Sequence, residues 1–452
     1  MNIQIIAFAL ILLTTIVLGY RSFSRLIRNI RLAKPTATEP EDASKRLKNV
    51  FLIAFGQKKM FARPLSAIMH LFIYVAFLVT QIELIEIIVD GLTGGHRTFY
   101  KPLGGLYTFV ISSIELMSVL AFVATLVFLS RRNLLRLPRF ASKDLKGFPT
   151  FDANLILVAE ILLITCIMLM NSADMSLKDG EQGFLISGMF FHIWDDTSEG
   201  TRIMLERIGW WGHILLVFGY LNYLPYSKHL HIMFAFPNTY FASLGEKGTL
   251  TNMPDIQKEV ASMFDPNAAL APVDTNAPMP KFGVKDVFDL ERKDLLAAYT
   301  CTECGRCTSS CPANLTGKAL SPRKIMMDIR DRADEIGKNI DDNRTEFIRE
   351  DQKGSTSTLT AENYDDGKNL FSYITEEELR ACTTCTACIE ACPVLISPMS
   401  IIVELRRNLI LEQSKSPEAW NSMFNALDNN GAPWAFPRDE RDRWAREINA
   451  NA

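Results

Sequence analysis

The chain has 452 residues, enough for two or three domains, and its formal net charge is −3 at pH 7. With 48 lysines and arginines against 51 aspartates and glutamates, it lacks the basic excess typical of nucleic-acid-binding proteins. Hydrophobic residues make up 48% of the sequence, and nearly all the long apolar runs lie before residue 240. The chain therefore divides into an apolar first half and a polar second half.

Five stretches of the first half are apolar and long enough to cross a bilayer, which takes roughly 20 helical residues. They are approximately 3–20, 65–90, 107–130, 153–171 and 209–236. The first lacks a basic amino-terminal region and a small-residue cleavage site, so it is predicted to be a membrane helix and not a signal peptide.

The basic residues between these stretches predict an orientation. Eleven lysines and arginines lie in 21–63 and six in 131–152, against two in 91–106 and three in 172–208. Because basic loops remain on the cytoplasmic side, the amino terminus is expected outside and the polar half in the cytoplasm. The sequence thus predicts a multi-pass protein of the cytoplasmic (inner) membrane.

Histidines mark both ends of the predicted bundle. His70 lies near the cytoplasmic end of the second stretch, while His213 and His231 lie at the outer and cytoplasmic ends of the fifth. On one continuous helix the latter two would share a face, about 27 Å apart. Neutral imidazole is a common axial ligand of haem iron. We therefore predict that His70 and His231 bind a haem; the alternative is a histidine hydrogen-bonded between helices.

Carboxylates also occur inside the predicted spans. Glu83, Glu86 and Asp90 share one helix face toward the outside, and further acidic residues are Glu115 and Glu160. Ionised carboxylates in lipid are costly, so these should face the bundle interior or a wet cavity. Glu83 and Glu86, with His213, form a candidate site for a quinone and its protons. The alternative is that Glu86 and Asp90 only mark a helix end.

The polar half begins with a linker. Residues 241–282 are polar and contain five prolines, which predicts irregular structure with short turns. A helical domain is expected over 283–415, with helices at 287–299, from Pro322 onward and at 397–413.

Two segments of the second half are less regular. Residues 339–370 are charged and rich in Ser, Thr and Gly, and we expect an irregular insertion there. Thr375 and Glu378 form a capping-box pattern that predicts the start of a short helix. Residues 416–452 are assigned to a carboxy-terminal tail.

Eight of the nine cysteines lie in two copies of Cys-x2-Cys-x2-Cys-x3-Cys-Pro. This run binds cubane iron–sulfur clusters in two-cluster ferredoxins, where the fourth cysteine of each run ligates the other cluster. One [4Fe–4S] cluster is therefore expected on Cys301, Cys304, Cys307 and Cys392. The other is expected on Cys382, Cys385, Cys388 and Cys311. The alternative, two zinc sites, usually pairs Cys-x2-Cys hairpins across a longer gap.

The remaining cysteine, Cys166, lies in an apolar run, so no disulfide framework is implied. Cysteines gathered as metal ligands indicate a reducing compartment for the second half. This agrees with the orientation that the basic loops predict.

The membrane half resembles the cytochrome b (gamma) subunit of respiratory nitrate reductase, in the form fused to iron–sulfur proteins. The segments that carry the resemblance are 66–70, 213–237 and LPYSKHLHIMFAFPN at 224–238. It implies an all-α, five-helix cytochrome b-like bundle over 1–240 with two b haems between the second and fifth helices. The inner pair maps onto His70 and His231, and the outer pair onto His213 and Thr80. Threonine is not a normal haem ligand, so His213 either faces a quinone or takes another ligand.

The cysteine-bearing segments CTECGRCTSSCPANLTGKALSPRKI and EELRACTTCTACIEACPVLISP resemble the heterodisulfide reductase D-type family. That family includes membrane-bound oxidoreductases that link electron-transfer flavoprotein to menaquinone. Its full-length members continue into a domain with paired Cys-Cys-Gly motifs, but this chain has no cysteine after Cys392. We expect a separate subunit to supply that domain.

The resemblances imply an oxidoreductase subunit that passes electrons between a quinone pool, haem b, two [4Fe–4S] clusters and a soluble redox partner. The partner would be a flavoprotein or a Cys-Cys-Gly subunit. The alternative is a haem-free membrane anchor or a redox sensor, which would have no need of the His70/His231 pair. The sequence shows no Gly-rich nucleotide fingerprint and no nucleophile constellation, so no substrate chemistry is assigned to this chain.

Overall fold

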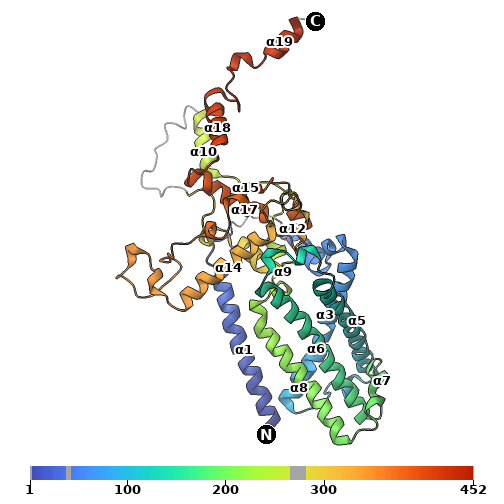
Figure 1. Ribbon diagram of the computed structural model, residues 1–452. Helices are drawn as coiled ribbons and strands as arrows, with labels where there is room; N and C mark the ends of the chain where they lie inside the picture. Colours follow the sequence, from blue (N-terminus) through green and yellow to red (C-terminus); the bar gives the residue numbers. More distant parts are fainter. Residues whose placement is uncertain (1–2, 37–41, 265–280, 451–452) are drawn as a thin grey trace.

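The computed structural model describes residues 3–36, 42–264 and 281–450. Over this part the predicted all-α architecture is confirmed, since the only β pairings among the described residues are three isolated bridges. Figure 1 shows a bundle of long helices with a smaller helical domain at one end and the amino terminus at the other.

Among the described residues, four helices are long and apolar enough to cross a membrane. Two of them, α3 and α6, begin with proline in the first turn, where the missing N–H is not needed. Helix α3 ends before Gly94, whose φ of 75° is a left-handed cap conformation. All four extend beyond the apolar stretches that predicted them. They are α1 (Ile3–Ile30), α3 (Pro64–Thr93), α5 (Gly105–Asn133) and α6 (Phe148–Leu177).

The fifth expected span, 209–236, differs from the structure. Helix α8 runs from Glu199 to Tyr223, and two 3-10 turns separate it from α9 (His231–Phe241). Pro225 lies in the first turn, where it cannot donate the backbone hydrogen bond that would continue the helix. The prediction that His213 and His231 share a face of one helix is therefore wrong. Helix α8 is not among the four that qualify as spans by composition.

Helix α8 nevertheless packs inside the bundle, against α6 and α1. At Gly209 an added Cβ would lie only 2.6 Å from the backbone nitrogen of Met170, so the two helices approach closely there. Such small residues are typical of contacts between membrane helices. Phe8 of α1 packs on Trp210 of α8, with ring centres 5.5 Å apart.

The second half folds around short helices that position the cysteine runs. Helix α14 starts at a Ser321 cap followed by Pro322, and the predicted capping box of Thr375 and Glu378 is confirmed. The buried core of this second half is continuous with the bundle, because Leu26 of α1 and Leu230 belong to the same cluster. The helices are α11 (Arg292–Thr300), α12 (Arg306–Ser310), α14 (Pro322–Asp341), α15 (Glu376–Ala381), α16 (Ala387–Ala391) and α17 (Pro398–Arg407).

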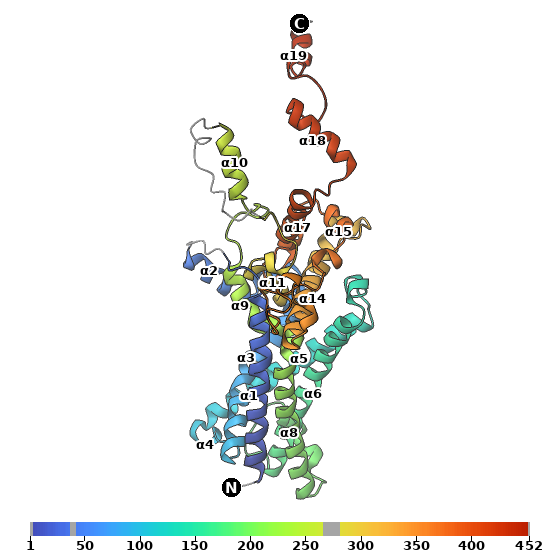
Figure 2. The same cartoon turned by 90° about the vertical axis from the view of Figure 1, so that its left-hand side faces the viewer.

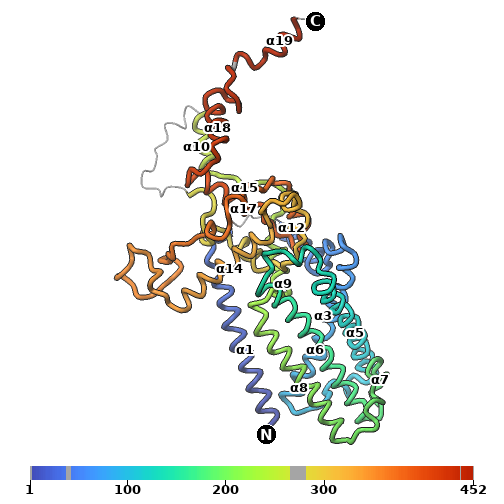
Figure 3. Tube along the Cα trace, in the orientation of Figure 1, coloured from blue at the N-terminus to red at the C-terminus, as the bar shows by residue number. Residues whose placement is uncertain are grey.

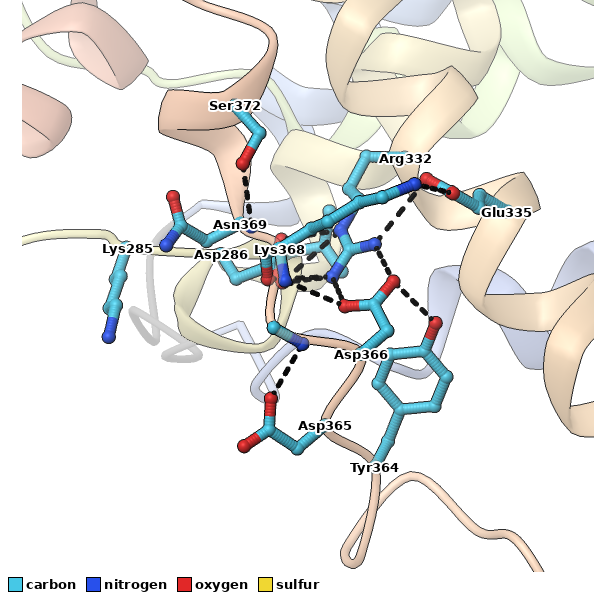
Figure 4. Close-up of polar contacts among 12 residues, drawn as sticks. Lys285, Asp286, Arg332, Glu335, Tyr364, Asp365, Asp366, Lys368, Asn369 and Ser372 are labelled. Carbon is cyan, nitrogen blue, oxygen red and sulfur yellow. Dashed lines mark hydrogen bonds and ion pairs between the residues drawn. The ribbon is translucent and has the colours of Figure 1, made fainter. Parts of the chain in front are cut away.

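The insertion after α14 is irregular, with 3-10 turns and two isolated bridges, Ile348 to Tyr364 and Lys353 to Thr356, and it protrudes from the domain (Figure 3). Arg332 of α14 holds its base (Figure 4). The guanidinium, 1% exposed, bonds Asp286 at 2.8 Å and Asp366 at 2.6 Å. A buried cation with two carboxylate partners keeps this segment attached.

Three helices project beyond the iron–sulfur domain (Figures 1 and 2). They are α10 (Pro254–Phe264), α18 (Glu418–Asn430) and α19 (Arg443–Ala450). Helix α10 lies within the expected linker, which is thus partly regular, and the rest of that linker from 265 to 280 lies outside the described residues.

Side chains on separate elements join the two halves. Arg323 of α14, 1% exposed, forms a bidentate pair with Asp144 at 2.9 Å in the loop between α5 and α6. Arg28 at the end of α1 pairs with Asp341. Beside it, a Cβ at Gly337 would meet the Asn29 amide at 2.1 Å, so only glycine fits this contact.

Candidate functional site

The first cysteine run encloses a small cavity together with one residue of the second. Helix α11 ends at Cys301, and the chain turns through Gly305 into α12. Cys301, Cys304 and Cys307 line the cavity, and Cys392 joins them from after α16. The structure thus brings together the four thiols expected to hold one cluster.

The second group of thiols consists of three cysteines of the second run and Cys311 of the first. Cys382 follows α15, Cys388 lies in α16, and the Cys311 thiol is close enough to both to interact with them electrostatically. Cys385 is solvent-exposed, whereas Cys301 and Cys392 are buried. The second group therefore reaches solvent at Cys385, while its Cys311 and Cys388 are buried.

The two cysteine loops have the same backbone path. Glu303 and Gly305 have φ values of 52° and 69°, and the corresponding Thr384 and Thr386 have 53° and 64°. These left-handed turns let backbone N–H groups reach sulfur: Thr384 N lies 3.4 Å from Cys382 Sγ. Hydrogen bonds to cluster sulfurs raise or lower reduction potential.

Among the described residues, no three His, Cys, Asp or Glu side chains converge on a point that one metal ion could occupy. A cubane has its four irons at separate corners, so its thiolates need not meet at one point.

His70 and His231 face each other where the bundle meets the iron–sulfur domain. Their ring centres are 6.4 Å apart and the planes are inclined by 40°. Two imidazoles bound to opposite sides of one metal would place their ring centres roughly 6 Å apart, with metal–nitrogen bonds of about 2 Å. The spacing of the two rings thus matches that of two imidazoles bound to one metal.

The hydrogen bonds of both rings leave the required nitrogen for a metal. His231 Nδ1 lies 3.0 Å from the carbonyl oxygen of Lys228, which can only accept, so Nδ1 carries the proton. His70 Nδ1 lies 3.0 Å from Gln57 Oε1 in the same arrangement. Nε2 remains as the potential ligand on each ring. Such outer partners fix the tautomer and the orientation of ligating histidines.

A short segment lies between His70 and the first cysteine loop. It contains the buried Gln57 and the 3-10 turn Lys58–Ala62. Arg306 of the loop donates to the carbonyl of Lys59 at 3.3 Å, and Lys59 donates to the carbonyl of Ile389 at 3.1 Å. One turn therefore contacts both cysteine runs and, through Gln57, the haem-ligand candidate.

His213 and Thr80, the positions predicted for a second haem, have different surroundings from His70 and His231. His213 is buried and its Nδ1 lies 3.3 Å from the carbonyl of Leu163, so it is held within the bundle. Thr80 bonds through its hydroxyl to the carbonyl of Phe77 on its own helix. No other described histidine ring is paired with His213.

A polar cavity of about 130 Å³ opens at the end of the bundle away from the iron–sulfur domain, between α1, α3 and α8. Glu83 and Glu206, each 3% exposed, line it, and one oxygen of each carboxyl has no hydrogen-bond partner among the described residues. Trp210 and Phe8 form the apolar wall. His213 is not part of this lining.

Glu86 and Asp90 have a structural role as well. Glu86 accepts from Tyr107 at 2.6 Å and from the backbone of Phe99 at 2.8 Å. Asp90 accepts from the backbone of Arg97 at 2.7 Å. Both thus hold the loop after α3. Of the three carboxylates, Glu83 has the fewest hydrogen-bond partners among the described residues.

Several residues of these sites were not found from the sequence. Gln57, Glu206 and Arg97 have no motif around them, and Lys228, although inside the segment 224–238, pairs with residues far away in the chain. Arg97 is buried and bonds Asn171 at 2.7 Å and Asp174. In the sequence Arg97 is one of two basic residues, with Lys101, in the segment 91–106, and nothing there indicates its buried partners.

The cysteine-bearing region matches a known protein family. Residues 300–396 match the family model of the 4Fe-4S dicluster domain. The chain therefore contains a 4Fe-4S dicluster domain, and its described residues include four helices long and apolar enough to cross a membrane.

The chain is 29% identical to the probable iron-sulfur-binding oxidoreductase FadF of Bacillus subtilis, covering 98% of this chain and 61% of the relative. It is 24% identical to the EtfAB:quinone oxidoreductase of Syntrophomonas wolfei, with 92% and 56% covered. It is 26% identical to a probable membrane-anchored ferredoxin of Chromohalobacter salexigens, with 55% and 35% covered. The chain thus spans about three-fifths of the length of the first two. No solved structure matches it.

Proposed function

We propose that this chain is a membrane-bound electron-transfer subunit connecting a quinone pool to a soluble cytoplasmic redox partner. Its cofactors would be two [4Fe–4S] clusters and a b-type haem, which exchange single electrons when bound. Cys301, Cys304, Cys307 and Cys392 would hold one cluster, and Cys382, Cys385, Cys388 and Cys311 the other.

The observation that carries the proposal is the position of the histidine pair. His70 and His231 have the spacing of axial ligands and lie beneath the cysteine loop that faces the bundle. An anchor without haem would have no need for two half-buried rings with their Nδ1 atoms oriented by acceptors. The partner would meet the opposite side, where Cys385 is exposed.

The outer cavity is the proposed quinone and proton site. Glu83 provides a carboxyl oxygen with no other partner, Glu86 forms part of the wall, and Trp210 offers an aromatic surface. His213 would act at one remove, within the bundle. Two of the relatives are named as oxidoreductases, one of them for a quinone. We infer reduction of a menaquinone-type quinone by a flavoprotein-type donor, with the reverse direction as the second candidate.

The test is a reduced-minus-oxidised visible spectrum of the detergent-purified chain, with iron, sulfide and haem quantified on the same sample. One b-type haem per roughly eight cluster irons is expected, since each cubane holds four. Two haems would mean that His213 has a ligand partner beyond Thr80. Clusters without haem would refute the quinone relay in favour of an anchor. His70→Ala should remove the haem and leave both clusters intact.

A further inference from the structure

Lys228 lies in the break between α8 and α9 and is buried, with 8% of its side chain exposed. Its ammonium group pairs with Glu303 and donates to the carbonyl of Pro149 at 2.7 Å. Its main chain is fixed too, because the amide donates to Asp152 Oδ2 at 3.1 Å and the carbonyl accepts from His231 Nδ1. One residue therefore touches the haem-ligand candidate on one side and the iron–sulfur domain on the other.

Glu303, the ion-pair partner of Lys228, lies in the first cysteine loop between Cys301 and Cys304. Its side chain is 3% exposed, and its two carboxyl oxygens are divided between Lys228 and Arg330 of α14, the latter at 2.9 Å. The carboxylate thus bridges the bundle and the domain within the loop that faces the bundle.

The second cysteine loop provides an internal comparison. Thr384 occupies the same position with nearly the same φ, 53° against 52°, yet it is exposed and uncharged. The backbone path of a Cys-x2-Cys turn therefore does not require glutamate. A buried charge occurs only in the loop next to the histidine pair.

Charges shielded from water act strongly on their surroundings, because the effective dielectric is low. A carboxylate beside a redox centre opposes the added electron and lowers its reduction potential, whereas an ammonium group raises it. We propose that the Lys228–Glu303 ion pair sets the reduction potentials of the two centres that flank it, the cluster of the first cysteine loop and the haem of His70 and His231. This rests on the proposed function and adds two positioning residues to it.

The pair also has a structural role, so the test must separate the two. Redox titrations of the full detergent-purified chain would follow the haem by visible absorption and the clusters by electron paramagnetic resonance. Glu303→Gln should shift the first cluster, and to a smaller degree the haem, to higher potential. Lys228→Met should shift both to lower potential. The double variant should lie closer to the wild type than either, and Lys228→Arg should restore wild-type values.

Thr384→Val is the matched control, since it changes the same position of the other loop and should leave the haem and the first cluster unchanged. Unaltered potentials in both variants, or a shift in the same direction in both, would overturn the proposal and leave a structural tie only. Iron, sulfide and haem contents identify variants that lose a centre. Should Glu303→Gln not retain the cluster, Lys228→Met decides alone, as it lies outside the cysteine loop. Absence of haem in the wild type would refute the proposed relay, while the cluster potential would still test the ion pair.

Discussion

His70 Nδ1 lies 3.0 Å from Oε1 of Gln57, a buried residue just before the 3-10 turn that contacts the first cysteine loop. The bond sets which nitrogen of His70 is free and orients the ring toward His231. It also connects that ring to the segment on which Arg306 rests.

Replacing Gln57 therefore tests the histidine site without touching a ligand. Gln57→Leu removes the acceptor and should weaken haem retention about 10- to 100-fold, the usual cost of losing an outer partner of a metal ligand. Gln57→Glu provides a stronger acceptor, makes the imidazole more electron-donating and should lower the haem potential. Haem loss on dilution and redox titration measure the two effects. Gln81→Leu is the control, because within the described part of the chain Gln81 bonds its own helix alone, at the carbonyl of Phe77. Equal haem loss in both leucine variants would contradict the assigned role.

The crossed arrangement of the cysteines predicts which substitutions resemble one another. Cys392→Ala should lose the same cluster as Cys301→Ala, because both thiols line one cavity. Cys311→Ala should instead resemble Cys382→Ala. Each variant should lose about half of the cluster iron, since each cubane has four cysteine ligands. Electron paramagnetic resonance distinguishes the two signals, and Cys166→Ala should keep all iron. A Cys392→Ala spectrum like that of Cys382→Ala would refute the crossed assignment.

The outer cavity makes Glu83 the carboxylate whose loss should matter most. Glu83→Gln should slow reoxidation of the chemically reduced protein by a quinone analogue by about 10²-fold, a typical contribution of a positioned proton carrier. Haem and cluster contents should not change. Glu160→Gln replaces another carboxylate of the membrane half that does not line the cavity, so its rate should remain near the wild-type value. Equal slowing in both variants would point to general disturbance of the bundle.

Arg332 predicts a local stability effect in the insertion. Arg332→Met leaves Asp286 and Asp366 without their shared cation, and should cost about 3–5 kcal/mol in the free energy of opening residues 339–370. The rate of limited proteolysis in that segment reports this opening. Lys353→Met removes an exposed pair with Glu350 in the same insertion and should cost less than about 1 kcal/mol. Comparable losses would show that Arg332 is not the attachment point.

The same site predicts a dependence on pH. Burial raises the pKa of Asp366, but the hydrogen bonds and charge of Arg332 outweigh this and hold it below its usual value. A carboxyl with a depressed pKa in the folded state stabilises at a pH above its unfolded pKa and loses this contribution as the pH falls. The difference in opening free energy between the wild type and Asp366→Asn should therefore be largest near neutral pH and shrink below pH about 4. A constant difference would contradict the assignment.

The features predicted from the sequence were those with a local signature. Apolar runs revealed the four long helices, and cysteine spacing revealed the dicluster domain, because both patterns are contained within a few tens of residues. The continuous helix predicted over 209–236 was wrong, because the sequence alone did not show that the chain breaks at Pro225 and that His231 begins a new helix. Gln57 and the Lys228–Glu303 pair could not be found, because their partners are set only by how distant segments pack.

The contacts of Arg323 with Asp144, Arg28 with Asp341 and Asn29 with Gly337 join the bundle to the iron–sulfur domain at separated points. A domain fastened in this way cannot swing between two docking positions, as a tethered carrier would. In the proposed relay, the gap between the histidine pair and the first cysteine loop would thus stay constant during turnover. Since electron tunnelling depends steeply on distance, the rate across this gap would be fixed, and encounters with the quinone and the protein partner would set the pace.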